Sequence, residues 1–141
     1  MARTFLGAGA LIFVALGSYH LVFTLRDLWG PRTFTPSDEN LRFAMMKSRL
    51  ALSPAVNLWD AWMGFNLSHS LGLILFGGGL LTIAWAHFPA FAQSPSLQFV
   101  AITVAVVYLA LSLRFWFWGP AVGTGIGLAC FLVAAVSLRA L

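Results

Sequence analysis

Charged side chains are scarce in this sequence of 141 residues, in which Asp, Glu, Lys and Arg together make up 9%. An average soluble chain carries about 25% of these residues, so this chain lacks the means to cover a surface that faces water. Hydrophobic residues make up 60%, and the mean hydropathy is +0.89. The composition therefore excludes an ordinary soluble domain and indicates a protein whose solvent is lipid.

Cysteine and acidic residues are almost absent. The single cysteine, Cys130, lies within an apolar run, so the sequence predicts no intramolecular disulfide and no cysteine metal motif. We expect Cys130 to be a small packing residue. Eight Lys and Arg against four Asp and Glu give a net charge of +4. Loops that flank membrane spans explain this excess. Because no basic motif is interleaved with aromatic residues, the sequence predicts no nucleic-acid partner.

The motifs of common enzyme classes are missing as well. The chain has no Walker A motif, no GxGxxG before a helix and no GxSxG elbow. Ser68, His69 and Ser70 are consecutive, so their side chains diverge around a helix and do not form a hydrolase site. The sequence also lacks the doubled halves with broken helices that are typical of transporters. These absences favour a protein that is not an enzyme, without excluding one.

Long apolar runs are what the sequence does have. Each of four runs is close to or above the roughly 20 residues that cross a bilayer: residues 4–25, 58–86, 97–116 and 120–138. No alternating strand pattern occurs, and backbone groups in lipid must be satisfied internally, so the runs are predicted to be helices. The predicted fold is an all-α integral membrane four-helix bundle, with residues 1–141 as one domain. We expect the first run to be a membrane helix and not a secretory signal.

The connections between the runs differ in character. "HFPAFAQSPS" is predicted to be an uncharged turn, and Gly119-Pro120 a tight hairpin. Residues 26–57 hold most of the charge, and there Thr35 is the predicted N-cap of a helix over residues 36–50. This helix is amphipathic, which is typical of a helix at a membrane surface. It either covers one end of the bundle or acts as a lid or a contact with anionic lipid.

The distribution of basic residues predicts the orientation. One side of the membrane would carry most of them: Arg26, Arg32, Arg42, Lys47, Arg49 and Arg114. The other side would carry Arg3 and Arg139. The positive-inside rule therefore predicts a multi-pass protein of the cell membrane with its long first loop in the cytoplasm and both termini outside.

Small residues recur at helical spacing in the fourth run. Gly119, Gly123 and Gly127 are four residues apart and form a smooth stripe that lets another helix approach closely. The stripe predicts either packing within the bundle or contact with a partner, in a homodimer or a larger membrane complex. The lipid bilayer is the other expected partner.

Polar residues interrupt the apolar runs. Asn66 and His69, in "GFNLSHS", are three residues apart and share a helix face. Counting from the loop ends of the helices, we expect a set of polar residues to gather in one half of the bundle: His20, Asn66, His69, Asp60, Arg26 and Arg114. Such residues within a membrane suggest a functional site, here a pocket for a small molecule or a lipid headgroup. The alternative is a set of hydrogen bonds that holds the helices together.

Two histidines at similar depth also allow a haem b hypothesis. His20 and His69 would be the axial ligands, and Arg26 and Arg114 would bind the propionates. No other metal site is predicted, because Asp60 is the only acid near these histidines. The sequence thus favours a structural or accessory subunit, or a bundle that binds a lipid or small ligand. A small membrane enzyme or haem b protein is the alternative.

The central part of the sequence resembles a known family. His20, then "FTPSDENLRFAMMKS", then "WDAWMGFNLSHSLG" follow one another in an order that resembles a family of small uncharacterised bacterial four-span membrane proteins. The resemblance covers His20 through Gly72, about half of the chain. It implies a four-span architecture and a place in the bacterial inner membrane. It implies no activity, because none is established for that family.

Overall fold

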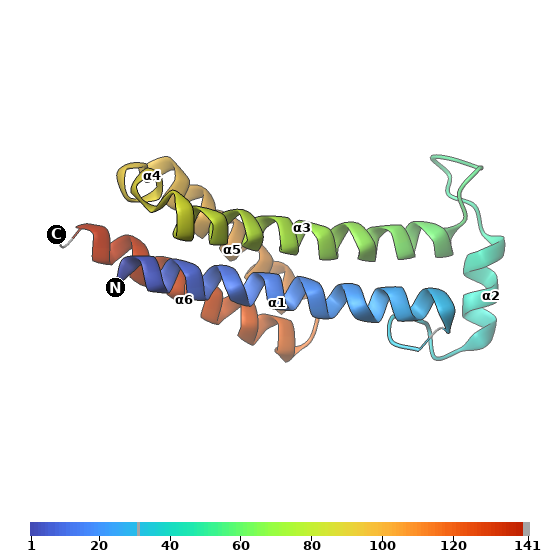
Figure 1. The fold of residues 1–141 in the computed structure, drawn as a ribbon. Helices are drawn as coiled ribbons and strands as arrows, with labels where there is room; N and C mark the ends of the chain where they lie inside the picture. Colours follow the sequence, from blue (N-terminus) through green and yellow to red (C-terminus); the bar gives the residue numbers. More distant parts are fainter. Residues whose placement is uncertain (31, 140–141) are drawn as a thin grey trace. The chain divides into compact units, whose positions relative to one another are not determined.

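A computed structural model of the protein describes residues 1–30 and 32–139 (Figure 1). In these residues the chain forms helices and no strand: α1 (Ala2–Trp29), α2 (Glu39–Lys47), α3 (Leu58–Ala86), α4 (Phe88–Gln93), α5 (Pro95–Phe115) and α6 (Trp118–Arg139). Helices α1, α3, α5 and α6 are long and apolar enough to cross a membrane. The predicted all-α fold and the four spans of a multi-pass membrane protein are confirmed.

The ends of the four long helices lie within a few residues of the ends of the predicted spans. Helix α3 has both of the predicted ends, whereas α1 continues to Trp29, beyond the apolar run that stops near Leu25. The extra turn contains Arg26 and Asp27, which are compatible with a helix but not with hydrocarbon. At about 1.5 Å per residue, the 28 residues of α1 extend about 42 Å.

The turn that follows α3 contains a short helix that the sequence analysis did not predict. Helix α4 begins with a proline in its first turn, where the missing N–H is harmless. The buried side chain of Gln98, in α5, donates hydrogen bonds from Nε2 to the carbonyl oxygens of Phe91 and Ala92, at 3.0 and 3.3 Å. Because these carbonyls belong to the last turn of α4, the amide stabilises a helix that is too short to persist alone.

The connector helix α2 is shorter than the predicted range of 36–50. Its N-cap is Asp38, whose side chain accepts a hydrogen bond of 2.9 Å from the backbone N–H of Asn40. The prediction that Thr35 is the N-cap is wrong, because the Thr35 hydroxyl donates to Asp27 Oδ2 at 3.2 Å. At the other end, Ser48 has extended backbone angles, so the helix stops at Lys47.

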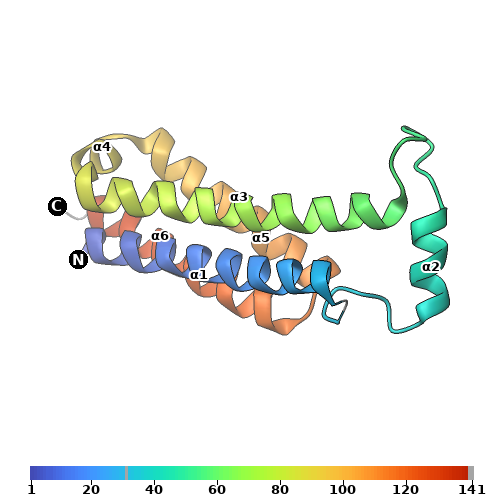
Figure 2. The same ribbon diagram turned by 45° about the vertical axis from the view of Figure 1, so that its right-hand side comes forward.

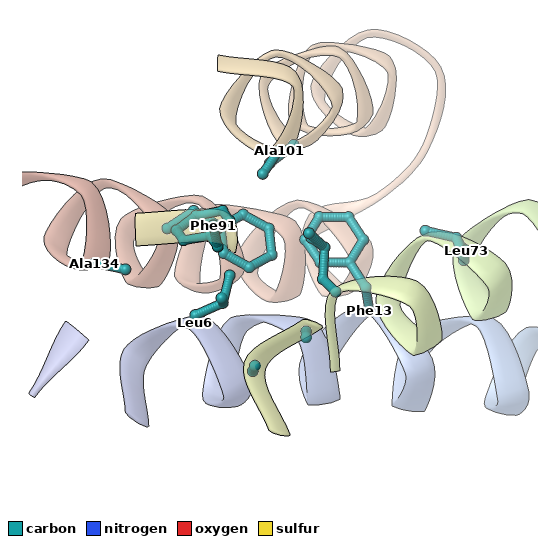
Figure 3. Packing of buried hydrophobic residues seen from close by; sticks show 11 residues of the cluster. Leu6, Phe13, Leu73, Phe91, Ala101 and Ala134 are labelled. Carbon is teal, nitrogen blue, oxygen red and sulfur yellow. The ribbon is translucent and has the colours of Figure 1, made fainter. Parts of the chain in front are cut away.

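The chain consists of two compact units, which we describe separately. The first unit contains Met1–Leu16 and the chain from Leu73 onward. Its core lies around Phe13, whose ring stacks on Phe131 at a centroid distance of 5.7 Å and meets Phe76 and Tyr108 edge to face. Figure 3 shows this packing, in which α1, α3, α5 and α6 all contribute side chains along with Phe91 of α4.

Two of the three glycines of the predicted stripe pack inside the first unit. A Cβ at Gly123 would lie 2.9 Å from the side chain of Leu16, and one at Gly127 would lie 2.7 Å from the Phe13 ring. Gly119 instead faces only Phe117, two residues before it. Two of the three glycines therefore allow α6 to pack closely against α1.

The second unit, Gly17–Gly72, contains the end of α1, the connector and the beginning of α3. In this unit α2 runs crosswise to the adjoining parts of α1 and α3 (Figure 2). The C-terminal end of α2 is attached to the beginning of α3, because the Leu58 N–H donates to the Ser48 carbonyl at 2.9 Å. A second hydrogen bond, from the Leu50 N–H to the Val56 carbonyl at 3.0 Å, closes the intervening loop.

Candidate functional site

The structure brings His20 of α1 and His69 of α3 together in the second unit. Their ring centroids are 5.2 Å apart, and the rings meet edge to face at 63°. His20 Nδ1 also lies 2.7 Å from the hydroxyl oxygen of Ser70, which follows His69 in α3. The two helices are therefore joined at this level by a hydrogen bond and an aromatic contact.

The hydroxyl groups around His20 favour one direction for this hydrogen bond, whose donor depends on the tautomer of His20. Each hydroxyl has one proton to donate. Ser70 donates its proton to the Asn66 carbonyl at 2.8 Å, and Thr24 donates its proton to the His20 carbonyl at 2.9 Å. Both hydroxyl oxygens are thus acceptors towards Nδ1, at 2.7 and 3.4 Å. We therefore assign the proton to Nδ1 of His20 from the hydrogen-bond network.

This assignment has a chemical consequence for Ser70. A serine becomes a nucleophile when a base accepts its hydroxyl proton. At this site His20 Nδ1 donates to Ser70, and the Ser70 proton is directed at a backbone carbonyl. With the proton on Nδ1, this atom cannot accept the Ser70 proton, and the arrangement orients His20 and joins the two helices.

Asn66 is completely buried and only half satisfied. Its Nδ2 group donates to the Trp62 carbonyl, one turn earlier in α3, at 2.8 Å. Its Oδ1 atom is buried and accepts no hydrogen bond from any described residue. A buried acceptor without a donor costs about 1–3 kcal/mol. Among the polar atoms of this region, Asn66 Oδ1 is thus an acceptor to which a ligand can offer a donor.

An aromatic residue of the connector covers His20, and a second one holds it there. The Phe34 ring stacks on the His20 ring at a centroid distance of 4.5 Å and an angle of 28°. Trp62 holds this part of the connector in place, because its Nε1–H donates to the Phe34 carbonyl at 2.8 Å. The site therefore depends on the connector as well as on the two helices.

Asp27 fixes the segment that carries Phe34. Its carboxylate is 1% exposed and accepts hydrogen bonds from the backbone N–H groups of Arg32, Thr33 and Phe34, at 2.6–3.2 Å, as well as from the Thr35 hydroxyl. The sequence analysis missed this role. A signal was present, however, since an acid in the last turn of a helix opposes the helix dipole and needs another stabilising contact.

A shallow cavity of about 440 Å³, widely open to the surface, lies near the histidine pair in the second unit. Its lining combines aromatic, aliphatic and hydroxyl side chains: Thr33, Phe34, Thr35, Pro36, Met45 and Trp62. This volume lies within the range of small-molecule sites, which are mostly apolar with a few polar groups. Phe34 stacks on His20, Trp62 donates to the Phe34 carbonyl, and both also line the cavity, so the two features are neighbours.

The remaining predicted site residues lie apart from this cluster or in the other unit. Asp60 is exposed and joined to Asn57 by two hydrogen bonds, of 2.7 and 2.8 Å, which cap the beginning of α3. Arg26 is also exposed, and its guanidinium lies 5.9 Å from the Phe23 ring of its own helix. Arg114 belongs to the first unit and is exposed, with its guanidinium 5.0 Å from the Phe115 ring. Of the six predicted residues, the structure brings His20, Asn66 and His69 together.

Replacing Ser70 by alanine is expected to lower the free energy of unfolding by about 1–2 kcal/mol, near the upper end for hydrogen bonds within membranes. The reason is that Nδ1 of the half-buried His20 would lose its closest hydrogen-bond partner, the buried hydroxyl of Ser70. Ser68, two residues earlier, is the control, because it is exposed and donates within its own helix, to the Phe65 carbonyl. Unfolding titrations in detergent should show a change within about 0.5 kcal/mol for Ser68→Ala. Equal losses in both variants would contradict the assigned hydrogen bond.

The geometry of the histidine pair does not fit a haem held between them. Axial imidazole nitrogens lie about 2 Å from a metal, so two rings on opposite faces of one macrocycle have centroids about 6 Å apart along a common axis. The observed rings are in edge-to-face contact at 5.2 Å, which leaves no layer for a porphyrin. Within residues 1–30 and 32–139, no group of three or more His, Cys, Asp or Glu side chains is placed to hold a metal ion.

Comparisons with known proteins do not assign a function to this site. No protein-family model, no curated protein and no solved structure matches the chain. The resemblance to bacterial four-span proteins therefore stays a prediction. The function has to be argued from the contacts and the cavity of the second unit.

Proposed function

We propose that this multi-pass membrane protein binds a lipid or another small amphiphilic molecule beside His20, Asn66 and His69. The observation that carries the proposal is the cavity of about 440 Å³, which shares Phe34 and Trp62 with the histidine cluster. A preformed, mostly apolar cavity next to a few buried polar groups is the usual form of a small-molecule site. The apolar part of the ligand would occupy the cavity.

The chemistry of the cluster suggests what the ligand carries. Asn66 Oδ1 is a buried acceptor that no described residue satisfies, so it calls for a hydroxyl, amide or amine donor. The Ser70 and Thr24 hydroxyls donate to backbone carbonyls and accept from His20, which leaves them little capacity for a ligand. The ligand is therefore expected to be an amphiphile with a donor in its polar group.

The position of the cluster along its helices agrees with a lipid-like ligand. His20 lies nine residues before the end of α1 and His69 eleven residues after the start of α3, which corresponds to about 13–16 Å from those ends. Helix α1 exceeds the roughly 30 Å of hydrocarbon by about 12 Å. Because Arg26, Asp27 and Asp60 are at these ends, the excess belongs outside the hydrocarbon, and the histidines come to lie near its boundary with the headgroups.

The proposal is tested by lipid retention in purified protein. The wild-type chain, incubated in detergent with a bacterial polar lipid extract and then washed, should retain a molecule that mass spectrometry identifies. Asn66→Leu removes the buried acceptor, and Met45→Trp fills the cavity. Each variant is expected to retain about tenfold less of that molecule, since about 1.4 kcal/mol of lost interaction corresponds to this factor.

Met46→Trp is the matched control for the cavity. Met46 follows Met45 directly, is exposed and does not line the cavity, so this variant should retain the ligand as the wild type does. Equal retention in all four proteins would contradict the proposal, because the molecule would then be bound elsewhere. The absence of any retained molecule in the wild type would contradict it too.

We also propose the predicted cellular setting: the bacterial inner membrane, with the connector and the histidine cluster on the cytoplasmic side. The support is the set of basic residues on that side of the chain, five of which lie in residues 26–49. An accessible cysteine at an exposed connector position, such as Ser37, in a chain with Cys130→Ala would be labelled from the cytoplasmic side only. Labelling from the outside would contradict this orientation.

A further inference from the structure

One face of α1 in the second unit carries aromatic and basic side chains that the histidine site does not use. Tyr19, Val22, Phe23 and Arg26 stand at positions i, i+3, i+4 and i+7 and therefore share this face. Tyr19 and Val22 are 69% and 46% exposed, and Arg26 is also exposed. We call these four residues the α1 flank. His20 lies on another face of the helix, which is turned towards α3.

Contacts within the α1 flank join its rings and its charge into one column along the helix. The rings of Tyr19 and Phe23 meet edge to face at a centroid distance of 4.5 Å. The guanidinium of Arg26 lies 5.9 Å from the centroid of the Phe23 ring, within the range of a cation–π contact. Side chains of a helix lean towards its N-terminus. The guanidinium is therefore drawn back from Arg26 towards the apolar part of α1.

The acid that follows Arg26 in the chain is turned away from the flank. Asp27 is 1% exposed, and its carboxylate accepts hydrogen bonds from the backbone N–H groups of residues 32–34. Asp27 thereby binds the connector, while the side chain of Arg26 stays exposed. An exposed guanidinium on an apolar helix face suits an anion that comes from outside the chain, and its planar fork of N–H donors matches a phosphate.

The depth of the flank in the membrane follows from the length of α1, which is long enough to cross a bilayer. The edge of the hydrocarbon lies near His20, because α1 exceeds the hydrocarbon by about 12 Å at this end. Phe23 follows His20 by three residues, or about 5 Å along the helix. The headgroup layer is about 5–7 Å thick on each side of the hydrocarbon. The guanidinium, held at the Phe23 ring, thus lies at the depth of the lipid headgroups.

From these observations we infer that the α1 flank binds an anionic phospholipid. The Arg26 guanidinium donates to the lipid phosphate, and the Phe23 ring holds it at that depth. Tyr19 and Val22 contact the adjoining part of the acyl chains, at the level where aromatic residues are enriched in membrane proteins. The inference does not rest on the ligand proposed for the cavity, because the flank and the cavity share no residue.

Lipid binding to the purified chain tests the α1 flank. The whole chain is titrated in detergent with phosphatidylglycerol or phosphatidylcholine of identical acyl chains, and native mass spectrometry counts the bound lipids. The wild type is expected to bind the first phosphatidylglycerol about fivefold more tightly, and Arg26→Gln to lose this preference. Phe23→Leu keeps an apolar side chain but removes the ring under the guanidinium, so the preference should fall to about twofold.

Two variants serve as matched controls. Arg49→Gln removes the same charge from an exposed connector residue, and Met45→Trp fills the cavity, so both should keep the preference. Equal affinity for both lipids in the wild type would overturn the inference. An equal loss of preference in Arg26→Gln and Arg49→Gln would also overturn it, since net charge alone would then attract the lipid. Loss in Met45→Trp with retention in Arg26→Gln would place the lipid in the cavity and overturn it too.

Discussion

Replacing Gly77 by leucine is expected to prevent the first unit from folding, and replacing it by alanine to lower the free energy of unfolding by about 1–3 kcal/mol. A Cβ at this position in α3 would lie 2.6 Å from the carbonyl oxygen of Ala10 and 2.7 Å from the backbone nitrogen of Val14. Backbone atoms within a helix cannot rotate away as a flexible side chain can. Any side chain at Gly77 therefore forces α1 and α3 apart.

Gly78 is the matched control for this prediction. A Cβ at Gly78 would meet nothing within 4 Å, so Gly78→Ala should leave stability unchanged or raise it slightly. Both substitutions improve helix propensity by the same amount, about 1 kcal/mol. Unfolding titrations of the two variants in mixed detergent micelles compare them directly. If Gly77→Ala were as stable as Gly78→Ala, the close approach of α1 and α3 at Gly77 would be contradicted.

The positions of the spans could be predicted because apolar runs are a local property of the sequence. Residues 58–86 give both ends of α3, and the other three spans differ by a few residues. The largest difference, at the end of α1, arises because hydropathy predicts the part of a helix that lies in hydrocarbon. The helix itself ends where its backbone hydrogen bonds end, at Trp29.

The beginning of the connector helix could not be predicted from local sequence. Thr35 and Asp38 are both good N-cap residues. The choice between them depends on Asp27, eight residues before Thr35 and in another helix, which accepts the hydrogen bond of the Thr35 hydroxyl. Tertiary contacts of this kind leave no local pattern, so a sequence with two adequate caps leaves the start of the helix open.

The candidate site could be predicted only in part, again because tertiary contacts leave no local sequence pattern. Counting residues from the loop ends of the helices predicted that His20 and His69 lie at similar depth, and their rings are in contact. The same count could not show which helix faces meet, so it placed Asp60 with the histidines, whereas Asp60 is hydrogen-bonded to Asn57, which caps the beginning of α3. It also missed Phe34, because a connector residue acquires its position only when the connector folds back over the helices.

Replacing Asp27 by asparagine is expected to release the segment that carries Phe34. The carboxylate accepts from three backbone N–H groups and one hydroxyl, and each hydrogen bond to a charged group is worth about 1.5–3 kcal/mol. Asparagine keeps one acceptor oxygen but turns its own N–H donors towards N–H donors of the chain. We expect a loss of about 3 kcal/mol, which corresponds to amide exchange about a hundredfold faster at Thr33 and Phe34.

Asp38→Asn is the control, because Asp38 is an exposed N-cap and asparagine caps helices about as well as aspartate. Its effect on exchange at Thr33 and Phe34 should be small. Since Phe34 stacks on His20 and lines the cavity, Asp27→Asn should also reduce ligand retention, although Asp27 does not line the cavity. Fast amide exchange at Thr33 and Phe34 with undiminished ligand retention would show that ligand binding does not depend on the order of this loop. Unchanged exchange would show that Asp27 does not hold the loop.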